Sequence, residues 1–335
     1  MATITDVSKR AGVSRSTVSR VVADNGYVSD EKRRAIEKAI AELGYRPNTL
    51  AQALRSQRSN MIGVVVVDVG TPYFANMVYG LQRASRAAGK SLMVSSGYAD
   101  RDEEAKAVVE LVDRSSDGLV LYLEHRLPPD VIDIIHRAQI PVVMIGRDAG
   151  LDAQGLVVID NVGGAASAIR FLLDRGHRKI VHLTGQPDFG DTIARLEGIR
   201  IALKQHEMTI DDIEVINGEF SEGCGYLTTN DLLASGREFT AIFAGSDDMA
   251  AGALMALREA GKRVPEDVSI IGFDDSFHAR HLWPALTTVR QPLDSLGQAA
   301  AEQIIKLMSD PKAGPLRTTI GTTLVRRDSV GWAGV

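Results

Sequence analysis

Residues 4–22 have the sequence ITDVSKRAGVSRSTVSRVV, and this stretch decides the fold of the N-terminal part of the chain. Thr5 or Asp6 is predicted to cap a first helix, and Gly12-Val13-Ser14 to break it. Ser14 is then expected to cap a second helix that continues through Val22. Two helices joined by a tight glycine-containing turn are typical of a helix-turn-helix, which places its second helix in the DNA major groove. The apolar residues expected to pack the pair together are Val7, Ala11, Val13 and Val18.

A third helix is predicted directly downstream. Asn25-Gly26 indicates a turn, Ser29 is expected to cap a helix that extends to Leu43, and Gly44 is expected to end it. Pro47 should close this unit, because proline cannot continue a helix. Residues 1–46 are therefore predicted to form an N-terminal all-α head.

Charge is distributed unevenly along the 335 residues. Residues 1–60 hold 11 Lys and Arg against 6 Asp and Glu, whereas the remainder holds 27 against 37, within a net charge of −5. Local positive charge is enough to neutralise phosphates, so this division favours a head that binds a polyanion. Chance clustering of basic residues is the alternative explanation of the same counts.

The composition predicts a globular protein that remains in the cytoplasm, where DNA binding by the head would associate it with the nucleoid. A content of 44% hydrophobic and 24% charged residues suits a full core. The one cysteine, Cys224, has no partner for an internal disulfide, which fits a reducing compartment. The sequence contains no apolar run of the roughly 20 residues that a membrane helix needs, and its first ten residues lack a signal-peptide core.

From residue 61 onward, short apolar runs alternate with amphipathic stretches. This alternation is typical of buried parallel strands joined by crossover helices. Strands are predicted at residues 62–69, 91–95, 119–123, 142–145, 157–159, 180–183, 241–244 and 269–273. So many strand–helix units favour two doubly wound parallel sheets, whose ligand would bind outside the carboxyl ends of the strands.

Several longer motifs resemble those of a known family. The first 60 residues contain GVS at 12–14, TVSRV at 17–21 and LGYRPN at 43–48, and the C-terminal part contains VPEDVSIIGFDD at 264–275 and PALTTVRQP at 284–292. On these residues the chain resembles the lactose-repressor (LacI/GalR) family, near its purine-repressor branch. The resemblance implies a DNA-binding transcription regulator, most often a repressor. It also implies an α/β sensor with two lobes, similar to periplasmic binding proteins, behind the helix-turn-helix head.

The resemblance also divides the chain. It implies a head at residues 1–46, a hinge helix or linker at 47–59, one sensor lobe at 60–160 plus 290–320, and a second lobe at 161–289 plus 321–335. Three crossings, near residues 160, 290 and 320, are expected to join the two lobes.

The second helix of the head is expected to face DNA. Arg15, Ser16 and Arg20 should project toward base edges, where an arginine can donate two parallel hydrogen bonds to one guanine. Thr17 and Ser19 are expected at phosphates. A surface helical pair with incidental arginines is the alternative. The predicted DNA-binding residues of the head are Thr5, Ser14, Arg15, Ser16, Thr17, Ser19 and Arg20.

Residues 48–59, NTLAQALRSQRS, combine a good N-cap with helix formers. A helix of about eight residues is too short to be stable alone in water, so this segment should fold against DNA, unless it is a plain flexible linker. The resemblance implies that Leu54 is an apolar wedge inserted into the minor groove, which kinks the duplex. By the same resemblance Asn48, Ala51 and Arg55 belong to the DNA-binding set.

The resemblance places a small-molecule site between the lobes. An arginine donates in a planar fork and an aspartate accepts twice, so Arg195 and Asp274 suit vicinal hydroxyls. Alternatives remain: Phe74 and Phe220 fit a core equally, Asp274 fits a helix cap, and Asp148 competes with Arg147. The expected effector-binding residues are Tyr73, Phe74, Arg147, Arg195, Phe220, Ser246 and Asp274.

The effector is expected to be a sugar or a sugar derivative. Similarity to the purine branch keeps a nucleobase open, and the two arginines leave room for a phosphorylated or carboxylated sugar.

Other classes of function find less support in the sequence. It contains no Walker loop, Gly-x-Gly-x-x-Gly, His-Glu-x-x-His or Gly-x-Ser-x-Gly motif and no cysteine cluster for zinc, so we expect no catalytic residue, metal or cofactor. An exported sugar-binding protein would share the two-lobed fold but would lack the head. We therefore expect a homodimer on a near-palindromic operator, because two-fold protein symmetry matches symmetric half-sites.

Overall fold

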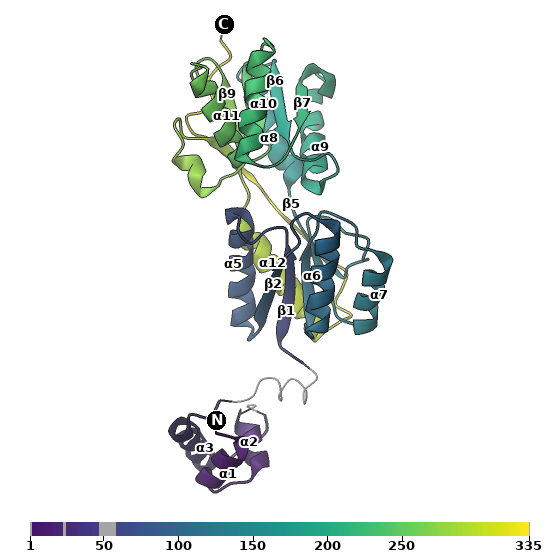
Figure 1. The fold of residues 1–335 in the computed structure, drawn as a ribbon, viewed down its shortest axis with the longest axis vertical. Coiled ribbons are helices and arrows are strands. Elements are labelled where there is room, and N and C mark those ends of the chain that lie inside the picture. Colours follow the sequence, from purple (N-terminus) through teal and green to yellow (C-terminus); the bar gives the residue numbers. More distant parts are fainter. Residues whose placement is uncertain (1, 23–24, 47–57, 335) are drawn as a thin grey trace. The chain divides into compact units, whose positions relative to one another are not determined.

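The structure is a computed structural model, and it describes residues 2–22, 25–46 and 58–334. The chain forms two compact units, residues 1–60 and residues 61–335, which are described separately (Figure 1). We call the first unit the head and the second unit the sensor.

The head contains the three expected helices: α1 (Ile4–Ala11), α2 (Arg15–Val22) and α3 (Asp30–Leu43). Its core is made of apolar side chains from all three helices. Val7 and Val18, predicted to join the first two helices, are fully buried, and Ala11 and Val13 pack against the same core. Val21, Ile36 and Ala39 complete the core, so α3 covers the helix pair.

The caps of the head differ in part from the prediction. Thr3, and not Thr5 or Asp6, caps α1, because its hydroxyl accepts the Asp6 backbone N–H while the Asp6 carboxylate accepts the Thr3 N–H in a reciprocal capping box. Ser14 caps α2 as expected, accepting the Thr17 N–H at 3.2 Å. Ser29 occupies the N-cap position of α3 without a capping hydrogen bond from its side chain.

The sensor contains two six-stranded sheets. The first has the strand order β11-β5-β4-β3-β1-β2 and is parallel throughout. We call this sheet with its helices the N-lobe. Helices α5 and α12 cover one face of the sheet, and α6 and α7 cover the other (Figure 1). The elements are β1 (Met61–Val66), α5 (Pro72–Ala87), β2 (Ser91–Ser96), α6 (Arg101–Asp113), β3 (Gly118–Tyr122), α7 (Pro129–Ala138), β4 (Val142–Ile145), β5 (Gly155–Ile159), α12 (Leu293–Ser309) and β11 (Leu316–Ile320).

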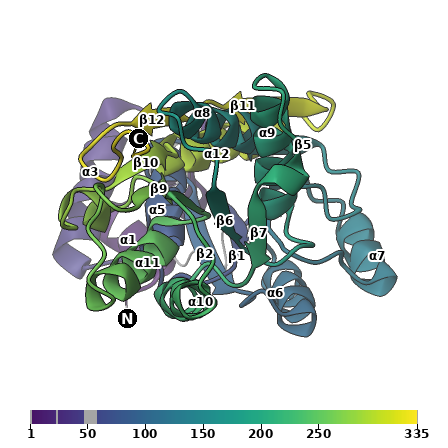
Figure 2. The same ribbon diagram turned by 90° about the horizontal axis from the view of Figure 1, so that it is seen from above.

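The second sheet has the order β12-β10-β9-β8-β6-β7, with only β12 antiparallel to its neighbour. We call this sheet with its helices the C-lobe. Helices α8 and α9 cover one face, and α10 and α11 the other (Figure 2). The elements are α8 (Asn161–Leu173), β6 (Ile180–Thr184), α9 (Gly190–Lys204), η1 (Ile210–Asp212), β7 (Glu214–Asn217), α10 (Glu222–Ala234), β8 (Ala241–Ala244), α11 (Asp247–Glu259), β9 (Ser269–Asp274), η2 (Phe277–Arg280), β10 (Thr287–Arg290) and β12 (Thr323–Val325).

The two doubly wound sheets confirm the predicted fold class, and every strand predicted from an apolar run is present. Four strands were not predicted: β7, β10, β11 and β12. β7, β11 and β12 lie at sheet edges and are only partly buried, so no continuous apolar run marks them. β10 contains two buried threonines, whose hydroxyls interrupt the apolar pattern.

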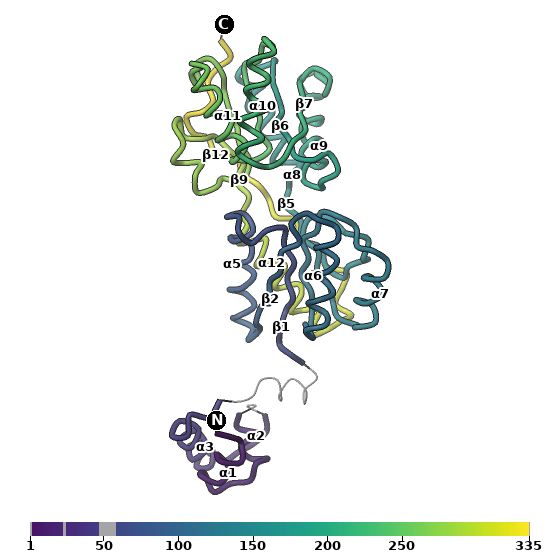
Figure 3. Tube along the Cα trace, viewed as in Figure 1, coloured from purple at the N-terminus to yellow at the C-terminus, as the bar shows by residue number. Residues whose placement is uncertain are grey.

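The chain passes three times between the lobes, at residue 160, at residues 291–292 and at residues 321–322 (Figure 3). Two of these crossings are bonded to each other: the Asp160 N–H donates to the Ile320 carbonyl at 2.8 Å, and the Thr322 hydroxyl donates to the Asp160 carbonyl at 3.1 Å. The second crossing leads into α12, which packs so closely on α5 that a side chain at Gly80 or Gly297 would meet the opposite backbone. A late segment of the chain thereby completes the N-lobe.

The capping box of α1 predicts a difference between two neighbouring threonines. Thr3→Ala should destabilise the head by about 1 kcal/mol, because the Asp6 N–H loses its acceptor and the Asp6 carboxylate loses the hydrogen bond from the Thr3 hydroxyl. Thr5→Ala is the matched control, since the described residues give the Thr5 side chain no capping bond. Amide hydrogen exchange of α1 in the full-length protein measures the loss of stability in each of the two variants. Equal loss of protection in the two variants would contradict the capping assignment.

Candidate functional site

A cavity of about 450 Å³ lies where the carboxyl ends of the two sheets meet, and we call it the large chamber. Six of the seven predicted effector residues line it: Tyr73, Phe74, Arg195, Phe220, Ser246 and Asp274. Each of them lies shortly after a strand end or in a helix that follows one, which is where a doubly wound sheet places its ligands. The seventh, Arg147, does not line this chamber.

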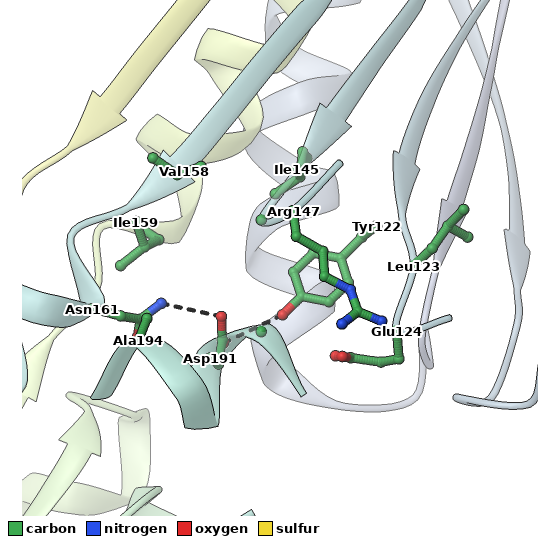
Figure 4. Close-up of a pocket in the computed structure, with 12 residues that line it drawn as sticks. Tyr122, Leu123, Glu124, Ile145, Arg147, Val158, Ile159, Asn161, Asp191 and Ala194 are labelled. Atoms are coloured by element: carbon green, nitrogen blue, oxygen red, sulfur yellow. Dashed lines mark hydrogen bonds between the residues drawn. The ribbon is translucent and has the colours of Figure 1, made fainter. Parts of the chain in front are cut away.

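Arg147 lines a neighbouring cavity of about 240 Å³, which we call the small chamber (Figure 4). Three residues belong to both linings and form the junction between the chambers: Tyr122, Glu124 and Asp191. None of these three residues was predicted from the sequence. The rest of the small chamber is largely apolar, with Leu123, Ile145, Val158, Ile159 and Ala194 in its wall.

Arg195 is almost completely buried, with 3% of its surface exposed. Its Nε–H donates to the Asn161 side-chain oxygen at 2.9 Å, and its two terminal nitrogens donate to the Gly245 carbonyl and to the Asp191 carboxylate. The guanidinium carbon also lies 4.0 Å from the centre of the Phe273 ring. These bonds use three of the five N–H groups of the guanidinium, so a buried charge is paired while donors remain for a ligand.

Asp191 is an acceptor that links the two lobes. Besides Arg195, it accepts hydrogen bonds from Asn161 at 3.1 Å and from the Tyr122 hydroxyl of the N-lobe at 3.3 Å (Figure 4). One sequence signal could have found it: Asp191 lies four residues before Arg195, on the same face of α9.

Asp274 ends β9 and accepts a hydrogen bond from the Gln291 side chain at 2.6 Å. Burial and the neighbouring Asp247 carboxylate raise the pKa of Asp274 well above its usual range. The helix-capping alternative is not supported, because the N–H of Ser276 before η2 donates to Asp247 and not to Asp274. The adjacent Asp275 turns away and forms ion pairs with Arg290 and Arg327.

The aromatic residues have roles in both the core and the chamber. Phe74 is 9% exposed and packs edge-on against Tyr73 and Tyr122, with ring centres 4.9 and 5.1 Å away. Phe220 lies beneath Arg195, with 5.2 Å between its ring centre and the guanidinium carbon. The Phe220 ring fills the space that a side chain at Gly185 would need, so the strand end after β6 has to be glycine.

Two further predicted residues are also bonded into the backbone around them. Ser246 caps α11 by accepting the Met249 N–H at 3.1 Å while its surface lines the large chamber. Asp148 accepts the Gly150 and Leu151 N–H groups in a turn, which leaves Arg147 to face the cavity. Arg147 donates to the Asp188 carbonyl at 3.0 Å.

Glu124 is 8% exposed and directly follows the apolar run of β3. Burial, with the negative charge of Asp191 as the next contribution, raises the pKa of Glu124 to about 8. The more deeply buried Glu104 accepts the backbone N–H groups of Glu124 and His125 at 2.9 and 3.0 Å and so fixes this loop. The sequence signal that could have identified Glu124 is its position as an acidic residue at the carboxyl end of a buried strand.

In the head, the side chains of Ser14, Arg15, Ser16 and Arg20 are exposed on or before α2, and those of Thr5, Thr17 and Ser19 are partly exposed. The Ser14 hydroxyl bonds to the hydroxyls of Ser16 and Thr17 at 2.7 and 2.8 Å. The DNA-contact roles of these residues stay predictions. Asn48, Ala51, Leu54 and Arg55 lie outside the described residues.

Two negative findings concern only the described ranges. No group of three or more His, Cys, Asp or Glu side chains in residues 2–22, 25–46 and 58–334 is arranged to hold a metal ion. Over the same ranges, no helix has the length and apolar character that crossing a bilayer requires.

The raised pKa of Glu124 predicts a pH dependence of stability. Between the ordinary carboxyl value of 4.5 and about 8, folded Glu124 keeps a proton that the unfolded chain has released, so the free energy of unfolding falls as pH rises. Each pKa unit corresponds to about 1.4 kcal/mol, which makes the total contribution a few kcal/mol at most. Urea unfolding between pH 5 and pH 8 measures the slope.

Glu124→Gln keeps the shape and removes the titration, so its loss of stability over this pH range should be smaller than that of wild type. A residual slope is expected from Asp274 and Glu104, whose pKa values burial also raises. An unchanged slope in Glu124→Gln would show that Glu124 releases its proton at an ordinary pH.

Comparison with known proteins identifies the family. Residues 3–48 match the model of bacterial regulatory proteins of the lacI family, and residues 169–330 match a periplasmic binding protein-like domain. The chain is 35% identical to the transcriptional regulator AscG of Escherichia coli (strain K12), covering 98% of both sequences. It is 33% identical to the transcriptional repressor PurR of Pectobacterium carotovorum, covering 98% of this chain and 97% of that protein.

Solved structures agree with this result. The lac repressor dimer bound to operator and an anti-inducer superposes with a TM-score of 0.87 at 28% identity, covering 98% of this chain and 99% of the other. A complex of the transcriptional regulator CelR with cellobiose gives a TM-score of 0.74 at 33% identity, covering 98% of this chain and 100% of the CelR chain. The chain therefore belongs to the lacI family of bacterial regulatory proteins and is a DNA-binding transcription regulator with a helix-turn-helix head and a two-lobed sensor.

Proposed function

We propose that this regulator is a homodimeric repressor whose affinity for a near-palindromic operator is controlled by a sugar bound between the lobes of its sensor. The observation that carries this proposal is the large chamber, in which Arg195 and Asp274 face a cavity walled by aromatic rings. The protein binds its effector without transforming it, and it acts in the cytoplasm. The lobes of the proposed sensor are residues 60–160 plus 290–320 and residues 161–289 plus 321–335.

The chemistry of the chamber favours a hydroxyl-rich ligand. Guanidinium donors and carboxylate acceptors pair with vicinal hydroxyls, and aromatic rings cover the apolar faces of a sugar. The linings of the two chambers contain two arginines, Arg147 and Arg195, against six carboxyl groups: Asp68, Glu124, Asp191, Glu219, Asp248 and Asp274. With Glu124 and Asp274 protonated, four carboxylates still face two guanidinium groups. This excess of negative charge disfavours phosphorylated and carboxylated sugars. Structural neighbours bound to cellobiose and to ribose support the sugar class.

The pocket is coupled to the geometry of the lobes through Gln291. This buried residue lies on the second crossing between the lobes and donates its side-chain N–H to Asp274. A ligand that bonds to Asp274 therefore acts on a group tied to the crossing, and the Asp191–Tyr122 bond spans the cleft beside it. We propose that effector binding shifts the lobes between two arrangements through these bonds, which is a coupling of two sites by a two-state element.

Operator contact is assigned to the head and the hinge. Arg15 and Arg20 contact base edges, Ser16 supports them, and Thr5, Ser14, Thr17 and Ser19 contact the phosphate backbone. In the hinge, Leu54 is the minor-groove wedge, with Asn48, Ala51 and Arg55 beside it.

A second copy of the chain is proposed to cover exposed apolar side chains of the C-lobe. Leu227 on α10, Met255 on α11, Phe277 on η2 and Trp283 shortly after it are all exposed, Trp283 to 93%. Large exposed apolar side chains of this kind are typical of protein–protein contacts. The related lac repressor dimer supports the two-fold assembly.

The effector assignment is tested at Asp274. We expect one uncharged sugar in a panel of glucose, galactose, ribose, cellobiose, glucose 6-phosphate and hypoxanthine to raise the melting temperature of the wild-type protein. Asp274→Ala should weaken its binding at least tenfold, about 1.4 kcal/mol, because a buried ligand hydroxyl loses its acceptor. Calorimetry measures the affinity. Operator binding without the sugar should be retained, so the variant no longer responds.

Asp211→Ala, at an exposed carboxylate on η1 outside both chambers, is the matched control. Unchanged sugar affinity in Asp274→Ala would place the effector elsewhere, and preferential binding of hypoxanthine or of the phosphorylated sugar would reject the proposed ligand class.

The operator assignment is tested with DNA selected from a random pool by the wild-type protein. Arg15→Ala should relax base preference at one position of each half-site by about 1–3 kcal/mol, since a bidentate contact to guanine is lost. Lys38→Ala, which removes one exposed positive charge from α3, should leave base preference unchanged. Competition binding with single-base operator variants is the measurement. Identical preference profiles for Arg15→Ala and wild type would remove Arg15 from the base-contacting set.

A further inference from the structure

The two chambers are separated only by the side chains at their junction. Tyr122, Glu124 and Asp191 line both, and the small chamber has more than half the volume of the large one, about 240 against 450 Å³. A molecule held by Arg195 and Asp274 in the large chamber therefore has a second cavity directly beyond it, on the side of Arg147 (Figure 4).

The small chamber contains a buried hydrogen-bond donor that lacks a partner. The Arg147 Nε–H is buried and has no hydrogen-bond acceptor among the described residues. The Glu124 side chain is more than nine-tenths buried, and within the part of the chain that the structure describes it receives no hydrogen bond and forms no ion pair within 4 Å. In Figure 4 the Arg147 guanidinium and the Glu124 carboxyl group point toward one another across the cavity. A buried donor is normally satisfied, so the free Arg147 Nε–H in a cavity that the Glu124 carboxyl group also lines indicates a polar ligand.

Asp191 does not serve as the missing partner. Its carboxylate already accepts from Tyr122, Asn161 and Arg195, so it is committed to holding the two lobes and the arginine. The free positions in the small chamber thus belong to Arg147 and Glu124, one a donor and the other able to accept.

The remaining wall matches the other surfaces of a sugar ring. Five apolar side chains line the chamber and can cover C–H faces: Leu123, Ile145, Val158, Ile159 and Ala194. The Asp191 carboxylate and the protonated Glu124 carboxyl group lie in the wall with the one arginine of this chamber. The chamber therefore suits hydroxyls and offers no net positive charge to a phosphate or a carboxylate.

We propose that the small chamber is a second subsite of the effector pocket, that the effector is an uncharged disaccharide spanning both chambers, and that Glu124 with Arg147 selects it over a monosaccharide. The first sugar unit bonds to Arg195 and Asp274, and a hydroxyl of the second unit accepts from Arg147 while donating to Glu124. This inference rests on the proposed function and adds the length of the ligand to it.

The test compares disaccharides with their component sugars on the full-length protein. Calorimetry is performed with cellobiose, maltose, lactose and melibiose, and with glucose and galactose. We expect one disaccharide to bind at least tenfold more tightly than either of its component monosaccharides. Glu124→Ala should abolish most of this advantage, and Glu124→Gln should retain it, because an amide still offers an acceptor and a donor.

A second variant protects the test against a folding defect at Glu124. Ala194→Leu fills the small chamber from α9 without removing a polar group, so it should cost disaccharide affinity at least tenfold and leave monosaccharide binding intact. Retained monosaccharide binding shows that the large chamber is folded.

Two outcomes would overturn the inference in different ways. A monosaccharide that binds as tightly as every disaccharide, with Glu124→Ala weakening both equally, would reject the second subsite alone. Binding of hypoxanthine with no binding of any sugar would reject the sugar class of the proposed function together with the second subsite.

Discussion

The buried guanidinium of Arg195 is the interaction on which the sensor depends. A charge that is 3% exposed is tolerated only when it is paired and hydrogen-bonded, and Arg195 achieves this with groups from four elements: Asn161 at the start of α8, Asp191 on its own helix, the Gly245 carbonyl after β8 and the Phe273 ring of β9. Satisfying one side chain therefore fixes the relative positions of two helices and two strands. Because Asp191 also accepts from Tyr122, the same network extends into the N-lobe.

The second constraint is the threefold crossing of the chain between the lobes. Each lobe is completed by a segment that arrives after the chain has passed through the other lobe, α12 and β11 in the N-lobe and β12 in the C-lobe, so neither lobe is a continuous stretch of chain. The crossings are bonded to each other through Asp160 and to the pocket through Gln291 and Asp274. The coupling that we propose between the pocket aspartate and the lobes therefore needs no longer path than these bonds.

The pocket is also electrostatically unfavourable in the absence of a ligand. Burial raises the pKa of Asp274 and brings that of Glu124 to about 8, and an unpaired Arg147 Nε–H remains nearby. Such groups lower the stability of the empty protein and are retained where they bind something, because a hydroxyl-bearing molecule supplies the missing donors and acceptors. This combination of buried acidic groups and aromatic rings suits sugars better than anions.

The sequence by itself determined the head, the two mostly parallel sheets and six of the residues that line the large chamber. Local rules were sufficient there: helix caps and glycine turns are set by neighbouring residues, buried parallel strands appear as apolar runs, and side chains at strand ends gather at one edge of a sheet. The Arg195 and Asp274 motifs identified their positions through the family resemblance. Only the tertiary structure decided which polar groups share a cavity. Asp191 lies 69 residues after Tyr122 in the sequence, and Glu124 is close to Tyr122. Only packing of the two lobes brings these three residues together as a junction, with Arg147 on one side and Arg195 on the other. Edge strands such as β7 and β12 were likewise invisible in the sequence, because pairing with a neighbouring strand, and not an apolar run, creates them.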